Sequence, residues 1–258
     1  MAKWCAMVLA ALLLGLGPAP SAYARVDVSP LPSDTDVDYQ LGGDAAPPDN
    51  VGIVVRDRTS DPVEGRYNIC YVNGYQTQDN EKKFWKKHWS LVLKDRDGRP
   101  VVDANWGEWL LDLRTPAKRS ALAEIVGGWA GQCADDGFDA VEFDNLDSFT
   151  RSEGLLTRKQ ALAFARLLID ASHTAGLAVG QKNLVGFDGT SIGFDYAVSE
   201  SCSRYDECGG YIEHFGDQVL MIEYRRQDFD ESCEAYGDQV PVVLRDRSLS
   251  PDGVHDWC

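Results

Sequence analysis

Sequence patterns that identify several common enzyme classes are missing from this chain of 258 residues. No G-x-G-x-x-G or G-x-x-x-x-G-K turn is present, which removes the main sequence evidence for a nucleotide-binding sheet. No C-x-x-C pair is present either, so we do not expect a zinc site built on paired cysteines. We also expect no nucleophile elbow of the serine-hydrolase type. Nucleotide, zinc and serine chemistry are therefore not the functions that this sequence favours.

Long hydrophobic runs are also scarce. The apolar stretch from Cys5 to Leu16 is well below the roughly 20 residues that span a bilayer. Lys3 before this stretch and Ala22-Tyr23-Ala24 after it are typical of a secretory signal, so we predict a signal peptide at residues 1–24. The mature protein is then expected to be secreted, with no membrane association after cleavage.

Basic residues are few relative to acidic ones. The chain has 25 Lys and Arg against 41 Asp and Glu, a formal charge of −16 that becomes −17 when Lys3 leaves with the signal. This charge argues against nucleic acid and anionic membranes as partners. It would suit a cationic substrate, although an acidic surface that maintains solubility is the simpler explanation.

Six of the seven cysteines remain after the predicted cleavage. An even number in an exported chain indicates three disulfides rather than free thiols. Cys202 and Cys208 are only six residues apart and are able to close one loop. Cys233 is able to pair with Cys258 and so tie the last strand–helix unit to the C-terminus. These considerations favour the pairs Cys70–Cys133, Cys202–Cys208 and Cys233–Cys258. The sequence alone leaves other connectivities open.

The organisation of the chain indicates a single barrel domain. Residues 25–50 are rich in Pro, Asp, Ser and Gly and are interpreted as an N-terminal leader. From residue 51 to residue 258, short β-branched and aromatic runs alternate with helix-like stretches, and several runs are apolar on both faces, like buried parallel strands. The predicted strands are 52–57, 67–74, 89–95, 138–145, 177–183, 194–200, 218–224 and 240–246. We therefore predict an α/β fold, a TIM-like (β/α)8 barrel, with a doubly wound sheet as the alternative.

Two helices and one hairpin have clear sequence boundaries. Thr157 starts a T-R-K-Q capping box, and the helix that follows is expected to end at Gly176. A second helix is expected from Pro116 to Asp135, with Gly137 just past its end. The turn at residues 97–98, an Asp-Gly pair between two apolar stretches, predicts a hairpin, which is an irregularity in a plain barrel.

Each predicted strand ends in polar or charged residues, and in a barrel these ends meet at one mouth. The residues concerned are Asp57, Asn73, Asp95, Asp144, Asn145, Lys182, Asn183, Glu200, Glu223, Tyr224, Arg245 and Asp246. Side chains alternate along a strand, so Glu142 and Asp144 share one face, with Glu142 one layer deeper. A deep carboxylate needs a cation, and Lys182 on the next strand is the expected partner in a buried brace.

Two carboxylates on different strands, among aromatics and amides, are the usual groups for cleaving a glycosidic bond. A calcium loop is the alternative for Asp144 and Asp147, but Leu146 occupies the third ligand position and the loop glycine is missing. The stretch at 94–99 also lacks calcium-loop spacing. His173 is interpreted as a packing or surface residue rather than a base. The residues therefore favour a carbohydrate-active enzyme without a bound metal.

The ordered segments "ICY", "EWLLDLR", "GFDAVEFDNLDSF", "GLAVGQKN", "FDYAVSESC" and "IEY" resemble glycoside hydrolase family 114, the endo-α-1,4-polygalactosaminidases. The resemblance covers nearly the whole mature domain. It implies a (β/α)8 barrel that cleaves α-1,4-linked galactosamine and N-acetylgalactosamine polymers without a metal or organic cofactor. It also implies two catalytic residues, with Asp144 as nucleophile and Glu200 as general acid/base by analogy with other α-glycosidase barrels. The residues expected to bind substrate, from the resemblance or from their strand-end position, are Asp57, Tyr71, Asn145, Asp147, Lys182, Asn183, Glu223, Tyr224 and Arg245.

This chain also departs from the family pattern. Many members carry a proline where this chain has Phe143, and the segment after "ICY", here "VNGYQTQDNEKKFW", differs as well. The second difference falls in a loop over the mouth, so subsite contacts are open. Two alternatives remain, an inactive carbohydrate-binding barrel and a glycosidase for another α-linked polysaccharide. The expected partner is a polysaccharide, cationic if partly deacetylated, and the sequence does not fix endo or exo action, stereochemistry or oligomeric state.

Overall fold

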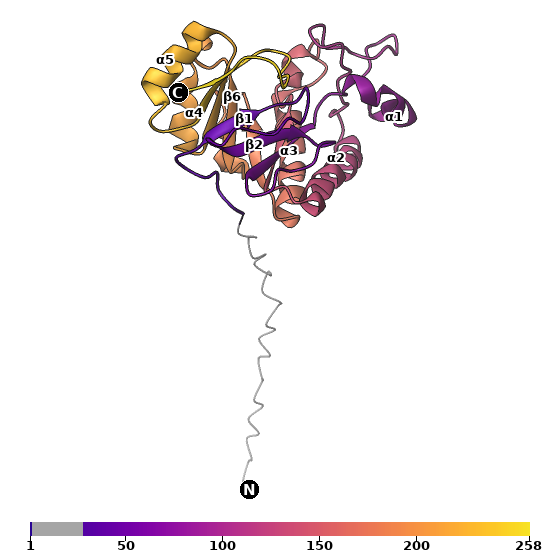
Figure 1. The fold of residues 1–258 in the computed structure, drawn as a ribbon. Helices are drawn as coiled ribbons and strands as arrows, with labels where there is room; N and C mark the ends of the chain where they lie inside the picture. Colours follow the sequence, from indigo (N-terminus) through magenta and orange to yellow (C-terminus); the bar gives the residue numbers. More distant parts are fainter. Residues whose placement is uncertain (2–27) are drawn as a thin grey trace.

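The computed structural model describes Met1 and residues 28–258, so the predicted signal peptide beyond Met1 lies outside the described residues. The described chain forms one sheet of nine strands whose spatial order follows the sequence. Strands β1 to β8 are parallel, and β9 runs antiparallel to β8. Because β8 also lies against β1, the parallel strands close into a barrel (Figure 1). The predicted (β/α)8 fold is confirmed.

The elements are short and follow one another closely along the chain. The strands are β1 (Asp36–Tyr39), β2 (Val51–Asp57), β3 (Tyr67–Asn73), β4 (Ala140–Asp144), β5 (Ala178–Lys182), β6 (Tyr196–Glu200), β7 (Val219–Glu223), β8 (Val242–Arg245) and β9 (His255–Trp257). The α-helices are α1 (Lys82–Lys87), α2 (Pro116–Asp136), α3 (Arg158–Thr174), α4 (Cys208–Phe215) and α5 (Arg226–Tyr236). Short 3-10 helices are η1 (Asp79–Glu81), η2 (Trp89–Leu91), η3 (Ser148–Arg151), η4 (Gly189–Ile192) and η5 (Ser203–Tyr205).

Both helices predicted from their end signals are confirmed. Helix α3 begins with the capping box, in which Thr157 Oγ1 accepts from Gln160 N and Gln160 Oε1 accepts from Thr157 N. Helix α2 begins with Pro at its first position, and Gly137 follows it in the left-handed conformation with φ of 100°. Only glycine adopts this conformation without steric cost, which explains why α2 ends there.

The predicted strand at 89–95 is wrong, and the barrel takes its first strand from the predicted leader instead. Residues 89–91 form η2, and the residues after them belong to the predicted hairpin, which is confirmed by the Lys94–Pro100 bridge and by Val101 N donating to Leu93 O at 3.0 Å. The apolar side chains of residues 89–95 therefore pack within the segment between β3 and α2 and not in the barrel sheet. Strand β1, at 36–39, completes the eight parallel strands.

An insertion at residues 74–115 separates β3 from α2. It contains α1, η1, η2 and the hairpin, and it is held together by antiparallel bridges. Trp85 of α1 is fully buried and packs edge-on against Trp129 of α2, with ring centroids 5.8 Å apart. The insertion is therefore anchored on α2, and α1 lies at the edge of the molecule (Figure 1).

Apolar side chains form two buried layers. The layer inside the barrel includes Tyr39, Ile53, Val198 and Ile222. The layer between strands and helices includes Val72, Val126, Leu168 and Met221. At Gly180 of β5 an added Cβ would lie 2.5 Å from the ring of Tyr196, so glycine makes room for this ring. The barrel is filled by side chains below its mouth.

Buried ion pairs join the strands where the barrel closes, and no α-helix follows β1, β2 or β8 within residues 28–258. Arg56 Nη2 lies 2.5 Å from Asp38 Oδ2, while Arg245 Nη1 and His255 Nε2 lie 3.6 and 2.9 Å from Asp38 Oδ1. Arg245 also donates to the carbonyls of Ser250 and Val254. The C-terminal segment thus covers the contact between β8 and β1, where other parts of the barrel have a helix.

The three predicted disulfide pairs are all present. Cys70–Cys133 links β3 to α2, Cys202–Cys208 closes a loop before α4, and Cys233–Cys258 ties α5 to the C-terminus. Each bond therefore joins a barrel element to a segment that packs on it or follows it.

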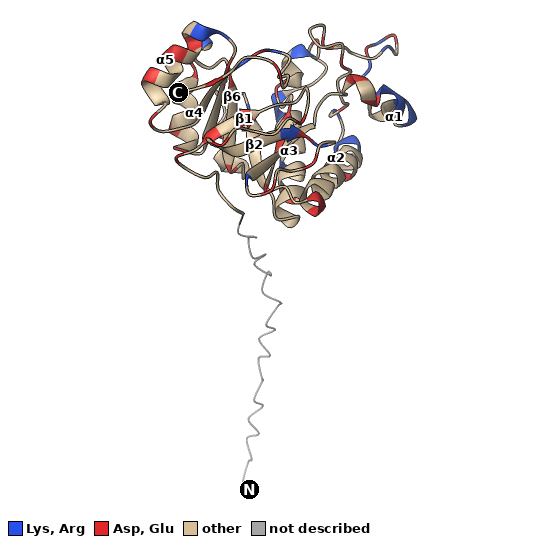
Figure 2. Cartoon of the chain, viewed as in Figure 1, with Lys and Arg blue, Asp and Glu red and all other residues tan. Residues whose placement is uncertain are grey.

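Charged side chains are distributed unevenly over the described surface. In Figure 2 the positions of basic residues gather on α1, which contains four lysines, and the positions of acidic residues are spread over many other elements. From residue 28 onward, none of the helices combines the length and the apolar character required to cross a bilayer.

Candidate active site

A cavity of about 460 Å³ opens at the C-terminal ends of the parallel strands. This is the end of a (β/α)8 barrel at which active sites lie. Eight of the predicted site residues line it: Tyr71, Asp144, Asn145, Asp147, Lys182, Asn183, Glu200 and Tyr224. The insertion at residues 74–115 contributes Gln78, Asp103, Asn105, Trp106 and Glu108 to the lining of the same cavity. The structure therefore brings most of the predicted site together.

Asp144, the last residue of β4, is held by two donors. Tyr71 OH donates to Oδ2 at 2.7 Å, and Asn145 N donates to Oδ1 at 2.8 Å. Burial, and then the charge of Asp144, raises the pKa of Tyr71 well above its usual value, so the phenol keeps its proton and remains a donor. The Asp144 side chain is 21% exposed, which leaves it accessible from the cavity.

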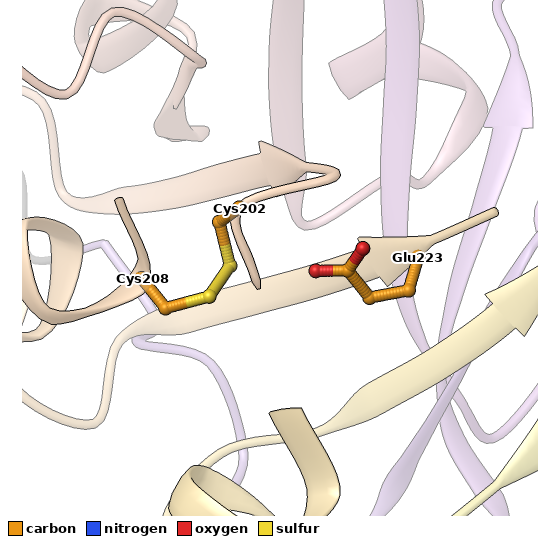
Figure 3. Close-up of side chains that lie close together, drawn as sticks. All are labelled: Cys202, Cys208 and Glu223. Carbon is orange, nitrogen blue, oxygen red and sulfur yellow. A yellow bond between two sulfur atoms is a disulfide. The ribbon is translucent and has the colours of Figure 1, made fainter. Parts of the chain in front are cut away.

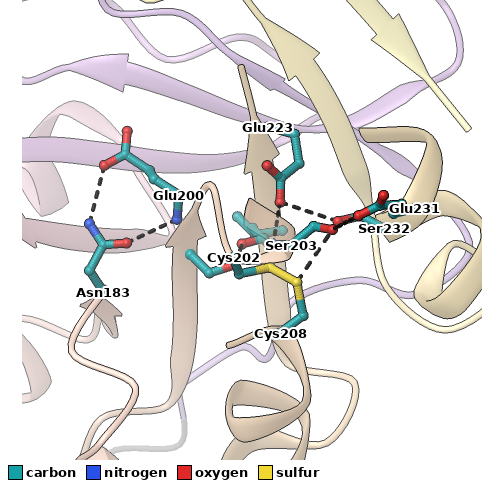
Figure 4. The surroundings of a disulfide bond; sticks show 10 residues. Asn183, Glu200, Cys202, Ser203, Cys208, Glu223, Glu231 and Ser232 are labelled. Atoms are coloured by element: carbon teal, nitrogen blue, oxygen red, sulfur yellow. Dashed lines mark hydrogen bonds between the residues drawn. A yellow bond between two sulfur atoms is a disulfide. The ribbon is translucent and has the colours of Figure 1, made fainter. Parts of the chain in front are cut away.

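Glu200, the last residue of β6, is held in a similar way. Tyr224 OH donates to Oε1, and Asn183 Nδ2 donates to Oε2 at 3.2 Å. The oxygen of the same Asn183 amide accepts from Glu200 N at 2.9 Å (Figure 4). One amide thus fixes both the backbone and the carboxylate of Glu200. Burial, and then the charge of Glu200, raises the pKa of Tyr224 well above its usual value.

The ammonium of Lys182 lies between the two carboxylates, 3.7 Å from Asp144 Oδ1 and 3.6 Å from Glu200 Oε2. These two oxygens are therefore at most 7.3 Å apart, because their separation cannot exceed the total of the two distances. Burial opposes the charge of Lys182, but the nearby carboxylates hold its pKa well above the usual value. Lys182 remains cationic and compensates both acids.

The buried brace predicted below the site is confirmed. Lys182 Nζ donates to Glu142 Oε1 at 2.6 Å, and Tyr39 OH donates to the same oxygen at 2.7 Å. Both Glu142 and Lys182 are almost fully buried. The brace therefore fixes the position of the cation that contacts the two carboxylates above it, and Lys182 has both roles.

The chain turns sharply after three of these strands. Asn145, Asn183 and Ser201, which follow the ends of β4, β5 and β6, have φ values of 68°, 52° and 56°. Non-glycine residues seldom adopt this left-handed conformation, although asparagine tolerates it better than most. Such strain is typical of functional sites, where the surrounding structure maintains it. Each turn leads the chain away directly after a side chain that lines the cavity.

Comparison with known proteins identifies the family. The profile of glycoside-hydrolase family GH114 matches residues 18–258. The chain belongs to family GH114. It is a glycoside hydrolase, as the sequence resemblance implied. The comparison with curated proteins gave no significant match.

Solved structures similar to this GH114 hydrolase share its fold. Ega3 from Aspergillus fumigatus, in complex with galactosamine, has a TM-score of 0.69 at 20% identity, with 95% of this chain and 100% of Ega3 covered. The glycoside hydrolase domain of PelA from Pseudomonas aeruginosa has a TM-score of 0.59 at 16% identity, with 87% of this chain and 99% of that domain covered. A variant of the PelA domain has a TM-score of 0.62 at the same identity. At these identities the likeness supports the fold alone.

Three predicted substrate-binding residues of the GH114 hydrolase do not line the cavity. Asp57 Oδ2 accepts from Gln78 Nε2 at 2.8 Å, so it contacts a residue that lines the cavity. Arg245 is buried and binds the C-terminal segment, and Glu223 is fully buried. Because side chains alternate along β7, Glu223 and Tyr224 point to opposite sides, and only Tyr224 faces the cavity. Glu223 and Arg245 are thus corrected from substrate contacts to structural residues.

Glu223 lies beside the Cys202–Cys208 disulfide (Figure 3). These three residues form a cluster of potential metal ligands among residues 28–258, but the two sulfurs are bonded to each other and provide no thiolate. Glu223 Oε1 instead accepts from Ser203 N at 3.0 Å and Ser232 Oγ at 3.2 Å (Figure 4). Burial raises the pKa of Glu223. This carboxyl joins the loop after β6 to α5.

Sequence reasoning missed Arg151, which joins the loop after β4 to the insertion. Its Nη1 lies 2.8 Å from Asp147 Oδ2, its Nε lies 2.8 Å from Asp103 Oδ2, and its Nη2 donates to Asn145 Oδ1. The Asp147 carboxylate is thus paired with a guanidinium. The four-residue spacing of Asp147 and Arg151 was the available sequence signal.

Two exposed aromatic residues of the site were also missed. Trp106 and Tyr205 line the cavity and are 61% and 62% exposed. Tyr205 also borders a second pocket of about 380 Å³ that shares Glu200 with the first and extends to Val185 and Tyr211. The two pockets therefore adjoin at Glu200 and Tyr205, which line both of them. Exposed aromatic faces provide apolar surfaces on which sugar rings stack.

One G-x-S-x-G sequence does occur in the GH114 hydrolase, at residues 189–193, but it forms no nucleophile elbow. Ser191 lies on η4, and its hydroxyl donates to Asp188 O at 2.6 Å. An elbow requires a turn from strand to helix at the top of the sheet. His173 of α3 has Nε2 2.8 Å from Asp195 Oδ2 and keeps the predicted packing role.

Proposed function

We propose that this GH114 hydrolase cleaves an α-1,4-linked polymer of galactosamine or N-acetylgalactosamine by a two-carboxylate mechanism. The observation that carries the mechanism is the proximity of Asp144 and Glu200, on separate strands, to the single ammonium of Lys182. Family membership and the galactosamine bound by Ega3 support the substrate class. An acidic cavity favours a substrate that carries amino groups.

Asp144 is assigned as the nucleophile and Glu200 as the general acid/base. In the first step an Asp144 oxygen bonds to the anomeric carbon, the glycosidic bond breaks, and Glu200 gives its proton to the leaving oxygen. In the second step Glu200 takes a proton from water, whose oxygen replaces Asp144 on that carbon. Lys182 remains charged throughout and compensates the carboxylates.

Retention of anomeric configuration is the expected outcome. Carboxyl groups lie about 5 to 5.5 Å apart in retaining glycosidases and about 6.5 to 9.5 Å apart in inverting ones. The limit of 7.3 Å between Asp144 Oδ1 and Glu200 Oε2 allows the separation of a retaining pair, and the assignment of Asp144 as nucleophile requires retention. NMR detection of the first-formed anomer tests this directly, and initial formation of the inverted anomer rejects Asp144 as a nucleophile.

We propose endo action on the polymer. Glu200 lines both pockets, of which the first is also lined by Trp106 and the second by Val185 and Tyr211. A polymer chain therefore has room to bind across the carboxylates rather than by its end. Endo cleavage produces oligosaccharides of many lengths early in the reaction, whereas exo cleavage produces one short product.

Mass spectrometry of soluble products tests the activity. Polygalactosamine is the substrate, and chitosan, whose linkage is β, is the control polymer. We expect a ladder of oligosaccharides from polygalactosamine and none from chitosan. No product from polygalactosamine, N-acetylated or not, would support the inactive barrel, and cleavage of chitosan alone would reject the substrate class.

Two substitutions test the catalytic assignment. Asp144→Asn and Glu200→Gln keep the shape of each side chain and remove its charge, and each should lower kcat by about 100-fold or more. Asp95→Asn is the matched control, because Asp95 lies in the hairpin of the insertion and does not line the cavity. Full activity in either of the first two variants rejects the assignment.

We also propose that the chain is secreted after cleavage at Ala24. Three disulfides suit an oxidising compartment outside the cytoplasm. N-terminal sequencing of protein recovered from the medium tests the position of cleavage, and a mature N-terminus at Met1 would reject it.

A further inference from the structure

One carboxylate of the cavity has no cation partner. Five carboxylates line the cavity, namely Asp103, Glu108, Asp144, Asp147 and Glu200. Lys182 lies within ion-pair distance of two of them, and Arg151 pairs with two others. The third cation of the cavity, Arg247, lies over the ring of Tyr224. Within residues 28–258, Glu108 is thus the cavity carboxylate without an ion pair.

The side chain of Glu108 is nonetheless held in place. Its Oε2 accepts from Asn73 Nδ2 at 3.0 Å, and the oxygen of the same Asn73 amide accepts from Asn145 Nδ2 at 3.0 Å. The amide of Asn73 is therefore fixed with its nitrogen toward Glu108. This leaves Oε1 of Glu108 to accept from a ligand in the cavity. Burial, with added repulsion from Asp144 and Asp103, raises the pKa of Glu108 to about 7. The site therefore lacks a positive charge at this point.

Glu108 and the exposed Trp106 lie on one short hairpin, which spans residues 102–109 and is distinct from the hairpin at 97–98. Asp103 N donates to Glu108 O, and Gly107 N donates to Asp103 O, both at 2.8 Å. Gly107, with φ of 72°, makes the turn between Trp106 and Glu108. The ion pair of Asp103 with Arg151 fixes this hairpin to the loop after β4. Trp106 and Glu108 thus line one wall of the cavity in a defined arrangement.

We infer that Trp106 and Glu108 form a subsite that selects a hexosamine with a free amino group. This inference rests on the proposed function. It assigns to Trp106 and Glu108 the preference of the enzyme for the deacetylated sugar. The sugar ring stacks on Trp106, and its ammonium donates to Oε1 of Glu108 and supplies the missing charge. Acetylation removes that charge, so an N-acetylated residue gains nothing from Glu108.

Glu108→Gln tests the subsite, because it removes the charge and keeps the oxygen that accepts from Asn73. The substrates are polygalactosamine and its fully N-acetylated counterpart. We expect kcat/KM to fall about 10-fold or more on polygalactosamine and less than about twofold on the acetylated polymer. Glu108→Asp keeps the charge and should retain more of the preference for the deacetylated polymer than Glu108→Gln. An equal loss on both polymers, or no loss on either, overturns the inference.

Asp79→Asn is the matched control for a general effect of charge. The Asp79 side chain is 76% exposed and pairs with Lys82 outside the cavity, so its removal should change neither substrate by more than about twofold. An Asp79→Asn effect as large as that of Glu108→Gln would reject a specific contact.

Binding of monosaccharides separates failure of the inference from failure of the proposed function. Galactosamine and N-acetylgalactosamine are titrated into wild-type protein and Glu108→Gln, with NMR detection. We expect wild type to bind galactosamine more tightly and Glu108→Gln to lose that difference. If wild type cleaves neither polymer, the proposed function fails and this titration still decides the role of Glu108. Equal binding of the two sugars by wild type overturns the inference.

Discussion

The phenol of Tyr71 donates a hydrogen bond of 2.7 Å to Oδ2 of Asp144, across the pair β3 and β4. The phenol of Tyr224, the residue directly after β7, donates to Glu200 in the same manner. Each proposed catalytic carboxylate therefore has one tyrosine as a fixed donor, on or directly after a neighbouring strand. Both phenols stay protonated and neutral, so they hold the carboxylates in position by hydrogen bonds without adding negative charge to the site.

Tyr71→Phe should lower kcat/KM by about 10-fold or more, because it removes a hydrogen bond to a charged group and leaves Asp144 less firmly oriented. Steady-state kinetics on polygalactosamine provide the measurement. Tyr67→Phe is the control, since Tyr67 OH donates to Ser29 O on the outside of the site. Equal activity of the Tyr71 variant and wild type would contradict the positioning role.

Lys182→Met should lose both activity and stability. It leaves the carboxyl of Glu142 buried without its cation, which costs about 3 to 5 kcal/mol of unfolding free energy. The double variant Lys182→Met, Glu142→Gln should recover much of that stability and none of the activity, because the cation beside Asp144 and Glu200 is still absent. Urea unfolding and kcat are measured in parallel. A double variant as unstable as the single one would show that Glu142 is not the source of the loss.

Removal of two different disulfides should affect stability and activity in opposite order. Replacing both cysteines of Cys70–Cys133, which are 63 residues apart, should cost about 4 kcal/mol, against about 2 kcal/mol for Cys202–Cys208, which are 6 apart. The Cys202–Cys208 variant should nevertheless lose more activity on long polymer, since that loop carries Tyr205 at the cavity. Denaturant unfolding and kinetics test both orders, and the reverse order in either measurement contradicts the prediction.

The stability of the protein should depend on the protonation of Glu108. Its pKa is raised from 4.5 to about 7, chiefly by burial, with Asp144, Asp103 and Asp79 adding and the Asn73 amide opposing. The folded state holds this proton more tightly than the unfolded state, so the contribution to stability is full below about pH 4.5 and is lost as pH rises through about 7. Glu108→Gln should therefore gain stability relative to wild type between about pH 5 and pH 8. Thermal unfolding at several pH values provides the measurement, and a difference that does not change with pH would contradict it.

Much of the site was predictable because parallel strands bring their C-terminal ends together. Asp144, Lys182 and Glu200 end their strands in the sequence and meet at the mouth of the barrel. Strand parity also predicted that Glu142 lies one layer below Asp144, where it contacts Lys182. The same rule, applied to β7, distinguishes Tyr224 from Glu223. The sequence assignment of Glu223 to the cleft did not use it.

Other features depend on contacts between distant parts of the chain. Strand β1 contains two acids and follows a Pro-rich stretch, and it is buried because Asp38 pairs with Arg56 and with Arg245 far along the chain. The residues at 89–95 have strand composition but pair within the insertion. Trp106 and Glu108 lie in that insertion. Glu108 opens the family-like segment "EWLLDLR", but strand order does not indicate that either residue faces the carboxylates.

The contacts between β1 and the C-terminal segment have a consequence for folding during synthesis. Trp257 Nε1 donates to Val37 O at 2.8 Å, and His255 contacts Asp38, so the earliest strand is covered by the last residues of the chain. A polypeptide synthesised from its N-terminus contains β1 long before it contains that cover. The edge at β1 therefore stays open until residues 242–258 have been synthesised, and the bond between Cys233 and Cys258 then ties this covering segment to α5.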